Sequence, residues 1–202
     1  AAIMCFSMIS TVFAAEFNFT DVKSSDWFYN DVKSAVEMGL INGKSPTTYA
    51  PNDNLTYAEA FKLAACMNQL YNEGAVTLTS GNPWYKSYVD YCSENDIGDD
   101  ILVMVENRLT QPATREVYMA IFAESLPDEG LKAINNVLDD SIPDVPSKNS
   151  LAPYIYKLYR AGILTGVDKA HNCNPIANIK RSEVAAILTR MMNEDKRIEF
   201  NM

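Results

Sequence analysis

Two arginines stand at matching places in short segments that have the pattern of a helix start. Arg115 follows Thr114 and Arg181 follows Lys180, whereas a third segment, Thr56-Tyr57-Ala58-Glu59, has a tyrosine at that place. Thr56 and Glu59 have the spacing of a capping box, which satisfies N–H groups of the first turn. A cation at the first helical position opposes the helix dipole, so stability does not explain the arginines. An arginine beside free N–H groups of a helix start is a good receptor for a carboxylate or phosphate. We therefore expect Arg115 and Arg181 to bind an anion, whereas the pattern supports a ligand contact at Tyr57 only weakly. The alternative for each arginine is a solvated surface charge.

The sequence contains little that could carry out catalysis or hold a metal ion. Its 202 residues include one histidine, His171, so a site that needs two histidine ligands is excluded. The acid pairs Asp99-Asp100 and Asp139-Asp140 are adjacent in sequence, and adjacent side chains do not face one another. His171 and Cys173 could form half of a metal site, but no second half accompanies them. The strings typical of serine hydrolases, zinc proteases and phosphate-binding loops do not occur. We therefore expect no enzyme, no cofactor and no metal site in this segment.

The charge balance restricts the class of binding partner. The chain is 48% hydrophobic and 21% charged, with a formal net charge of -9. A nucleic-acid binder needs a basic patch, and so does a module that binds an anionic membrane surface. An acidic chain is also repelled by an anionic polymer, although salt limits the range of this repulsion to about 8–10 Å. Recognition of such a polymer would depend on a local pocket, with modest salt dependence.

The first residues have the pattern of an export signal. Residues 1–13 form an uncharged apolar run, and Val12-Phe13-Ala14 resembles a small-residue cleavage site. The run is too short to cross a bilayer as a stable helix. We expect residues 1–15 to be a signal-peptide remnant, with cleavage after Ala14 or Ala15, secretion of the chain and no membrane anchoring of it after cleavage. The alternative is a buried first helix.

The rest of the chain contains an internal repeat. Matching residues of an early and a late segment lie 123 positions apart: Asp21 and Asp144, Gly39 and Gly162, and Gly43 and Gly166. A weaker middle copy is marked by Trp27 and Trp84, which lie 57 positions apart. In the middle copy aspartates replace both glycines, and in the third copy Ser150 replaces the tryptophan. We predict three units, with a linker helix before the third: residues 16–78, 79–128 and 129–202, and the helix at 131–138.

Each unit has the pattern of a helix, a loop and a second helix. Apolar residues recur at helical spacing over residues 32–40 and 60–67 of the first unit and over the corresponding parts of the third. The intervening loops are rich in turn-forming residues, and Gly43 and Gly166 are expected to close turns that need a positive φ. One such unit cannot bury enough apolar surface alone, so the second helices are expected to pack on one another. The sequence therefore predicts an all-α, mainly helical bundle.

The order of these motifs resembles the S-layer homology (SLH) repeat. The segments of the first unit that carry the resemblance are Phe19-Thr20-Asp21-Val22, Trp27, Ala35 to Gly43, Tyr49-Ala50-Pro51 and Leu55-Thr56-Tyr57-Ala58-Glu59. The match extends over about residues 17–195; it is strongest in the first unit and degraded in the second. The resemblance implies three SLH-like helix-loop-helix repeats that form a pseudo-trimeric bundle with loop prongs.

The resemblance also implies a function at the cell surface. Proteins similar to this one attach non-covalently to a secondary cell-wall polymer, an anionic polysaccharide linked to peptidoglycan in Gram-positive-type envelopes. Grooves between their repeats hold an acidic terminal sugar, commonly pyruvylated N-acetylmannosamine. The matching positions in this sequence are Asp21, Asp144, Trp27, Trp84, Gly43, Gly166, Arg115 and Arg181. The alternative for the tryptophans is a place in the core, and for the aspartates an N-terminal turn or a helix cap.

A second function is a protein–protein or self-assembly module of a surface layer. Its contact surface would be the group formed by Tyr154, Tyr156, Tyr159, Met191 and Met192. SLH-type repeats often sit beside another domain, so a further domain or a surface-layer partner is compatible with either function.

Overall fold

The computed structural model describes residues 17–202, and the predicted signal-peptide remnant lies outside them. Within that range the fold contains seven α-helices and no β-sheet, as the all-α prediction requires. The helices are α1 (Tyr29–Glu37), α2 (Tyr57–Glu73), α3 (Lys86–Glu94), α4 (Asp99–Val105), α5 (Arg115–Glu124), α6 (Ala152–Arg160) and α7 (Arg181–Met192). Three short 3₁₀ helices accompany them: η1 (Glu106–Arg108), η2 (Asp128–Leu131) and η3 (Glu194–Lys196).

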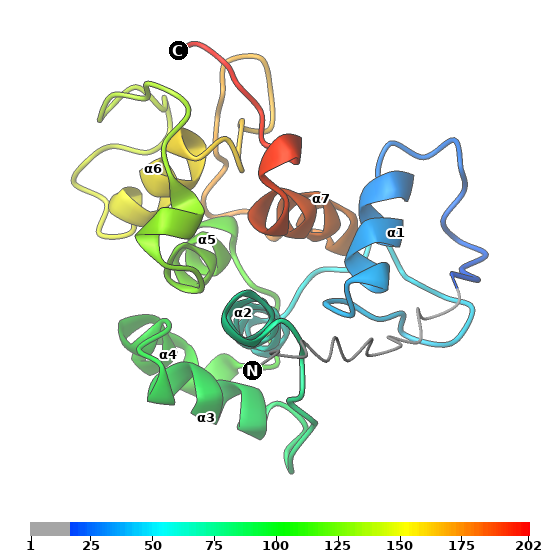
Figure 1. The fold of residues 1–202 in the computed structure, drawn as a ribbon. Helices are drawn as coiled ribbons and strands as arrows, with labels where there is room; N and C mark the ends of the chain where they lie inside the picture. Colours follow the sequence, from blue (N-terminus) through cyan, green and yellow to red (C-terminus); the bar gives the residue numbers. More distant parts are fainter. Residues whose placement is uncertain (1–16) are drawn as a thin grey trace, which may run out of the picture.

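The first helix of each predicted unit packs on the second helix of a different unit. In the contacts between elements α3 lies against α2, α6 lies against α5 and α1 lies against α7. The pair of α1 and α7 brings the early and late parts of the chain together and closes the assembly into a ring (Figure 1). A helix-loop-helix unit therefore does not pack as a separate hairpin; each unit is completed by its neighbour.

A ring of backbone hydrogen bonds joins the segments that precede α2, α5 and α7. The amide of Leu55 donates to the carbonyl of Ile179 at 2.9 Å, and the amide of Ala113 donates to the carbonyl of Leu55 at 2.7 Å. The amide of Ile179 closes the ring on the carbonyl of Ala113 at 3.4 Å. Each of the three segments gives one donor and one acceptor, so the arrangement has approximate threefold symmetry. The division of the chain into three repeats stays a prediction, with which this symmetry is compatible.

The core lies between the second helices and the first helices that cover them. Ala60, Ala64 and Ala65 of α2 are fully buried, and α2 packs directly on α5, whereas α7 packs mainly on α1; the predicted packing of second helices on one another is thus seen for one pair. Small side chains let helices approach closely, while the large buried rings, among them Phe61, Tyr118 and Phe122, fill the space between layers. Of the helices between residues 17 and 202, none is long and apolar enough to cross a membrane.

The predicted linker helix at 131–138 is wrong. Only η2 is helical there, and the chain continues without regular structure from residue 132 to 138. The amides of Ile134 and Asn135 donate to the carbonyl of Arg160 at 2.7 and 2.9 Å, and the Asn135 side chain donates to the carbonyls of Tyr159 and Ile198. Asparagine competes with the backbone for hydrogen bonds and has a low helix propensity, so these tertiary contacts prevail over the apolar pattern.

Candidate functional site: two grooves between the units

The starts of α2, α5 and α7 are covered by loops of a neighbouring unit. At the start of α7 the amides of Arg181 and Ser182 donate to the carbonyls of Asp53 and Pro51 at 2.9 and 3.0 Å. The other two starts have the same arrangement: the first two amides of α5 donate to Ala177 and Pro175, and those of α2 to Gln111 and Leu109. The expectation of free N–H groups beside the arginines is therefore wrong, because these amides hold the units together.

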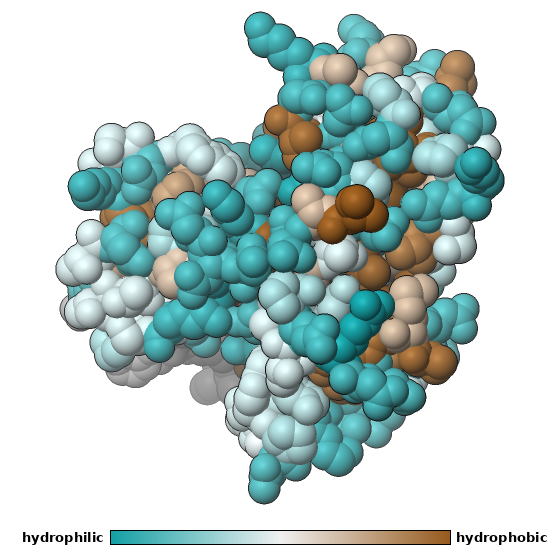
Figure 2. Space-filling model, turned by 180° about the vertical axis from the view of Figure 1, so that it is seen from behind, coloured by the Kyte–Doolittle hydropathy of each residue, from teal (hydrophilic) through white to brown (hydrophobic). Residues whose placement is uncertain are grey.

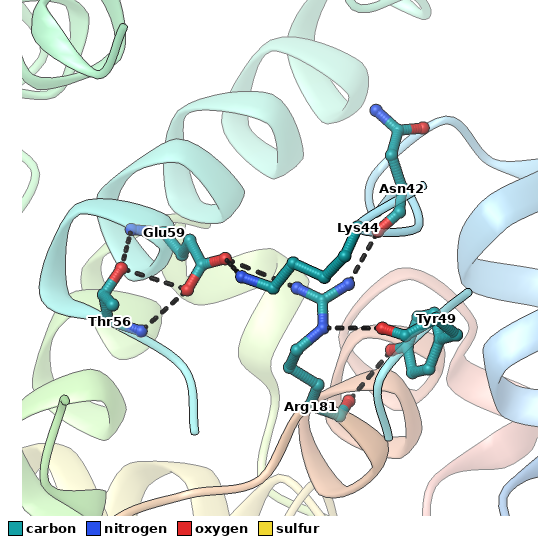
Figure 3. Close-up of polar contacts among 6 residues, drawn as sticks. All are labelled: Asn42, Lys44, Tyr49, Thr56, Glu59 and Arg181. Carbon is teal, nitrogen blue, oxygen red and sulfur yellow. Dashed lines mark hydrogen bonds and ion pairs between the residues drawn. The ribbon is translucent and has the colours of Figure 1, made fainter. Parts of the chain in front are cut away.

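Arg181 is a buried side chain at a junction of three chain segments (Figure 3). Its Nε donates to the carbonyl of Tyr49 at 3.0 Å, and its Nη2 donates to the carbonyl of Asn42 at 2.6 Å. Its Nη1 forms an ion pair with Glu59 at 3.4 Å, and its guanidinium lies 4.8 Å from the centre of the Tyr49 ring. The alternative of a solvated surface charge is wrong for this residue.

Glu59 connects Arg181 to the start of α2. Its Oε2 accepts hydrogen bonds from the amide and hydroxyl of Thr56 at 2.9 and 3.0 Å, while its own amide donates to the Thr56 hydroxyl at 3.2 Å. The predicted capping box is thus confirmed. The Oε1 atom of Glu59 pairs with Lys44 at 2.8 Å as well as with Arg181 (Figure 3). Burial opposes ionisation of Glu59, but the Lys44 and Thr56 hydrogen bonds and the charges of Lys44 and Arg181 hold its pKa below the ordinary value.

Arg115 has an equivalent but less crowded environment. It is buried, its Nε donates to the carbonyl of Cys173 at 2.8 Å, and its Nη1 pairs with Glu183 at 2.9 Å. Cys173 stands where the first unit has Tyr49, and Glu183 where it has Glu59. Within residues 17–202 the Nη2 of Arg115 has no hydrogen-bond partner, so two N–H groups stay available there. A solvated surface charge is ruled out for this arginine too.

A groove of about 290 Å³ lies beside Arg181, and three units contribute to it. The first unit gives Gly43 and Glu59, the second gives Trp84 and the third gives Arg181. Aliphatic side chains of the first unit form the rest of the wall: Leu40, Ile41, Leu55 and Leu63. We call this the Arg181 groove.

A second groove, of about 150 Å³, has the same parts in rotated order. The third unit gives Gly166 and Glu183, the first gives Trp27 and the second gives Arg115. We call this the Arg115 groove. Each of the two grooves therefore combines a glycine loop and a glutamate from one unit, a tryptophan from the next and an arginine from the one before.

The two tryptophans are exposed at the edges of these grooves. Trp27 has 66% of its surface exposed and Trp84 has 40%, so the alternative that they are core residues is wrong. Each packs edge-to-face on the aromatic residue that follows it, Phe28 or Tyr85, with ring centres 5.4 and 5.5 Å apart. Large exposed aromatic surface is common at binding sites. The chain therefore presents one aromatic ring at each groove.

Gly43 and Gly166 let the loop backbone fold tightly beside each arginine. A Cβ at Gly43 would lie 2.6 Å from the carbonyl oxygen of Ser45, and one at Gly166 would lie 2.6 Å from the Cα of His171. Gly166 has the predicted positive φ, at +88°, but Gly43 does not, so that part of the prediction is wrong. Close approach of the backbone, rather than dihedral angle alone, explains why both positions are glycine.

Asp21 and Asp144 act as clamps on the loop backbones. The carboxylate of Asp21 accepts from the amides of Tyr49 and Ala50 at 2.8 and 2.7 Å. Asp144 accepts from the amides of Cys173 and Asn174 at the same two distances. Neither aspartate lines a groove, so the structure supports a positioning role. Their partners are 28 to 30 residues away in sequence, which also corrects the alternative of a local cap.

The third position in this rotation lacks the residues that define the other two grooves. It would combine the loop of the second unit, which has Asp100 in place of the glycine, with Tyr57 in place of the arginine and Ser150 in place of the tryptophan. Tyr57 has only 2% of its surface exposed, and its ring packs against the guanidinium of Arg108 at 5.3 Å. We therefore reassign Tyr57 from ligand contact to packing. The replaced glycine, arginine and tryptophan come from three different units but all fall at this one position. The described residues form the complete set at the other two positions.

Sequence reasoning missed two lysines that line the Arg181 groove, Lys44 and Lys62. Neither recurs in the other groove, because Val167 and Ala186 stand at the corresponding positions. A search for repeated residues therefore could not detect them. The capping pattern also gives only half of the role of Glu59 and Glu183, because each pairs with the arginine of another unit as well.

Comparisons with known proteins agree with the motif order. The family model of the S-layer homology domain matches residues 18–61. The chain is also similar to the Surface-layer 125 kDa protein of Lysinibacillus sphaericus, with 30% identity over 115 residues, 54% of this chain and 10% of that protein. The chain therefore corresponds to about a tenth of the length of that relative.

Proposed function

We propose that this chain, which carries an S-layer homology domain at residues 18–61, anchors a secreted protein non-covalently to the bacterial cell wall. The ligand is an acidic secondary cell-wall polysaccharide, with a pyruvylated sugar as the group that enters each groove. The observation that carries the proposal is the recurrence of one arrangement in two grooves: a buried arginine, a glycine loop and an exposed tryptophan.

The chemistry of each part fits such a ligand. The exposed ring of Trp27 or Trp84 offers a flat apolar surface to a sugar face. A guanidinium fixed by backbone carbonyls offers its remaining N–H groups to a carboxylate without first having to be ordered. Because the whole chain has a charge of -9, attraction for an anion is confined to these grooves and does not extend over the surface.

The comparisons point to an anchoring module rather than to an enzyme. The described part of the chain has no cluster of His, Cys, Asp and Glu side chains suited to a metal ion. Burial raises the pKa values of the thiols of Cys66, Cys92 and Cys173, which disfavours their nucleophilic form. An anchoring module needs neither, and the similarity to a surface-layer protein favours that role.

The alternative of a protein–protein module loses most of its suggested surface. Tyr156, Tyr159 and Met191 are buried, with 0–2% of their surface exposed. On the face seen in Figure 2 hydrophobic residues are interspersed among hydrophilic ones. Assembly through other residues stays a second candidate that the binding experiment addresses.

The proposal is tested by sedimentation with purified cell-wall sacculi. We expect the wild-type chain to sediment with intact sacculi and to stay in solution when the pyruvylated polymer has been extracted. The double variant Trp27→Ala/Trp84→Ala should bind intact sacculi weakly while keeping the wild-type circular dichroism spectrum. Binding that is unchanged after polymer extraction would contradict the proposal and favour a protein partner.

A further inference from the structure

The two grooves differ in their balance of charge. Among its described lining residues the Arg181 groove has two lysines, Lys44 and Lys62, besides the arginine, against the single carboxylate of Glu59. The Arg115 groove has two arginines, Arg115 and Arg190, against the carboxylate of Glu183. The Arg181 groove therefore carries one more positive charge, although most of its parts match those of the other groove.

Lys62 is the cation whose charge is least engaged by the protein. Lys44 pairs with Glu59 at 2.8 Å, and Arg181 is held by two carbonyls as well as by Glu59. No carboxylate of the described chain lies within 4.0 Å of the Lys62 ammonium, which faces the ring of Tyr88 at 5.6 Å, at the border between the Arg181 groove and an adjacent hollow that Lys62 and Tyr88 line together. A ring does not neutralise an ammonium, so this charge stays available to a ligand.

Arg190, the second cation of the Arg115 groove, is held by a backbone carbonyl. Arg190 donates to the carbonyl of Ile163 at 3.0 Å. Burial raises the pKa of Asp31, and the nearby charge of Arg190 opposes that rise; burial lowers the pKa of Arg190 itself. The position that corresponds to Lys62 is Ala186, which also lines this groove. The Arg115 groove therefore lacks a free ammonium at the place where the Arg181 groove has one.

We infer that Lys62 binds a second anionic group of the ligand, so that the Arg181 groove takes a dianionic sugar unit and the Arg115 groove a monoanionic one. The dianionic unit carries a carboxylate for Arg181 and a further carboxylate or a phosphate for Lys62. This inference rests on the proposed function, because it concerns the same grooves. It makes Lys62 a specificity-determining residue that no repeated motif indicates.

The two tryptophans make each groove separately observable. The chain has two tryptophans, and each lines a different groove. In a Trp27→Phe background the fluorescence of Trp84 reports on the Arg181 groove, and in a Trp84→Phe background Trp27 reports on the other. The probes are the methyl glycoside of pyruvylated N-acetylmannosamine, a monoanion, and the same glycoside with an added methyl phosphodiester, which carries one further negative charge and is a dianion.

The measured quantity is the ratio of the two dissociation constants in each background. In the Trp27→Phe chain we expect the phosphorylated probe to bind about fivefold more tightly than the monoanion, since a partly exposed ion pair contributes about that factor. Lys62→Gln should remove this preference and leave the affinity for the monoanion within about twofold. Ala186→Lys in the Trp84→Phe chain should create the preference in the Arg115 groove. Lys33→Gln on α1, a lysine with an exposed partner outside both grooves, is the matched control.

The outcomes separate the inference from the proposed function. If the monoanion binds both grooves and Lys62→Gln keeps the preference for the phosphorylated probe, the role of Lys62 is refuted while the proposed function stands. The role of Lys62 is also refuted, and the proposed function stands, if both probes bind each groove with equal dissociation constants. If neither probe quenches either tryptophan, the proposed function fails and the inference fails with it.

Discussion

Replacing Arg181 by methionine should destabilise the whole fold. Methionine keeps the apolar stem of the arginine but removes the guanidinium, and the arginine side chain is only 4% exposed. The carbonyls of Tyr49 and Asn42 would then lose their donors at 3.0 and 2.6 Å, and Glu59 would lose one of its two cations. Removing one partner of a buried pair costs about 3–5 kcal/mol. We expect a decrease of that size in the free energy of unfolding.

The assay is urea unfolding followed by far-ultraviolet circular dichroism, with the midpoint and slope fitted for each variant. Lys86→Met is the matched control, because Lys86 forms an exposed pair with Asp90 on one helix and its loss should change stability by less than about 0.5 kcal/mol. A decrease below about 1 kcal/mol for Arg181→Met would refute a structural role for the buried guanidinium. The prediction also has a practical consequence: lost wall binding in an Arg181 variant does not by itself identify a ligand contact, so the exposed tryptophans are the better probes.

Three other perturbations test separate parts of the account. Trp84→Ala should lower the free energy of unfolding by only about 1–2 kcal/mol, because 40% of the residue is exposed and the rest packs on Tyr85, yet weaken sedimentation with sacculi; a loss above about 3 kcal/mol would return this residue to the core. Asp21→Asn should cost about 1–3 kcal/mol in urea unfolding, since the amides of Tyr49 and Ala50 lose a charged acceptor, and an unchanged midpoint would contradict the clamp. The lowered pKa of Glu59 means that its contribution to stability is complete above the ordinary value of 4.5 and is lost as the pH falls from there through the folded pKa. The stability difference between wild type and Glu59→Gln, measured by urea unfolding at pH 7 and at pH 3, should therefore shrink in acid, and a constant difference would exclude Glu59 as the titrating group.

The local features of the fold were predictable from the sequence because they depend on residues close together in the chain. The capping box of Thr56 and Glu59 and the start of α5 at Arg115 are examples. The rotation of units was not predictable. Periodicity places Trp27 in the first unit and Arg115 in the second. It does not indicate that both side chains line the groove formed by the loop of the third unit.

The burial of the two arginines and their hydrogen bonds to loop carbonyls also could not be predicted from the sequence. A helix start with an arginine predicts an anion receptor, but the covering loops whose carbonyls bind the amides and the guanidinium come from another unit. The same applies to Asp21, whose partners at Tyr49 and Ala50 are fixed only when the loop folds back on the N-terminal segment. Lys62 has no repeated counterpart, so only the geometry of the groove assigns it a role.

The measurement that tests the central claim most directly is the stoichiometry of sugar binding. Titration calorimetry of the chain with the pyruvylated N-acetylmannosamine glycoside should give two sites per chain, one in each groove, because the third position has the buried Tyr57 in place of an arginine. Trp84→Ala and Trp27→Ala should each reduce this to one strong site. Three equal sites, or a single site unaffected by both substitutions, would contradict the account.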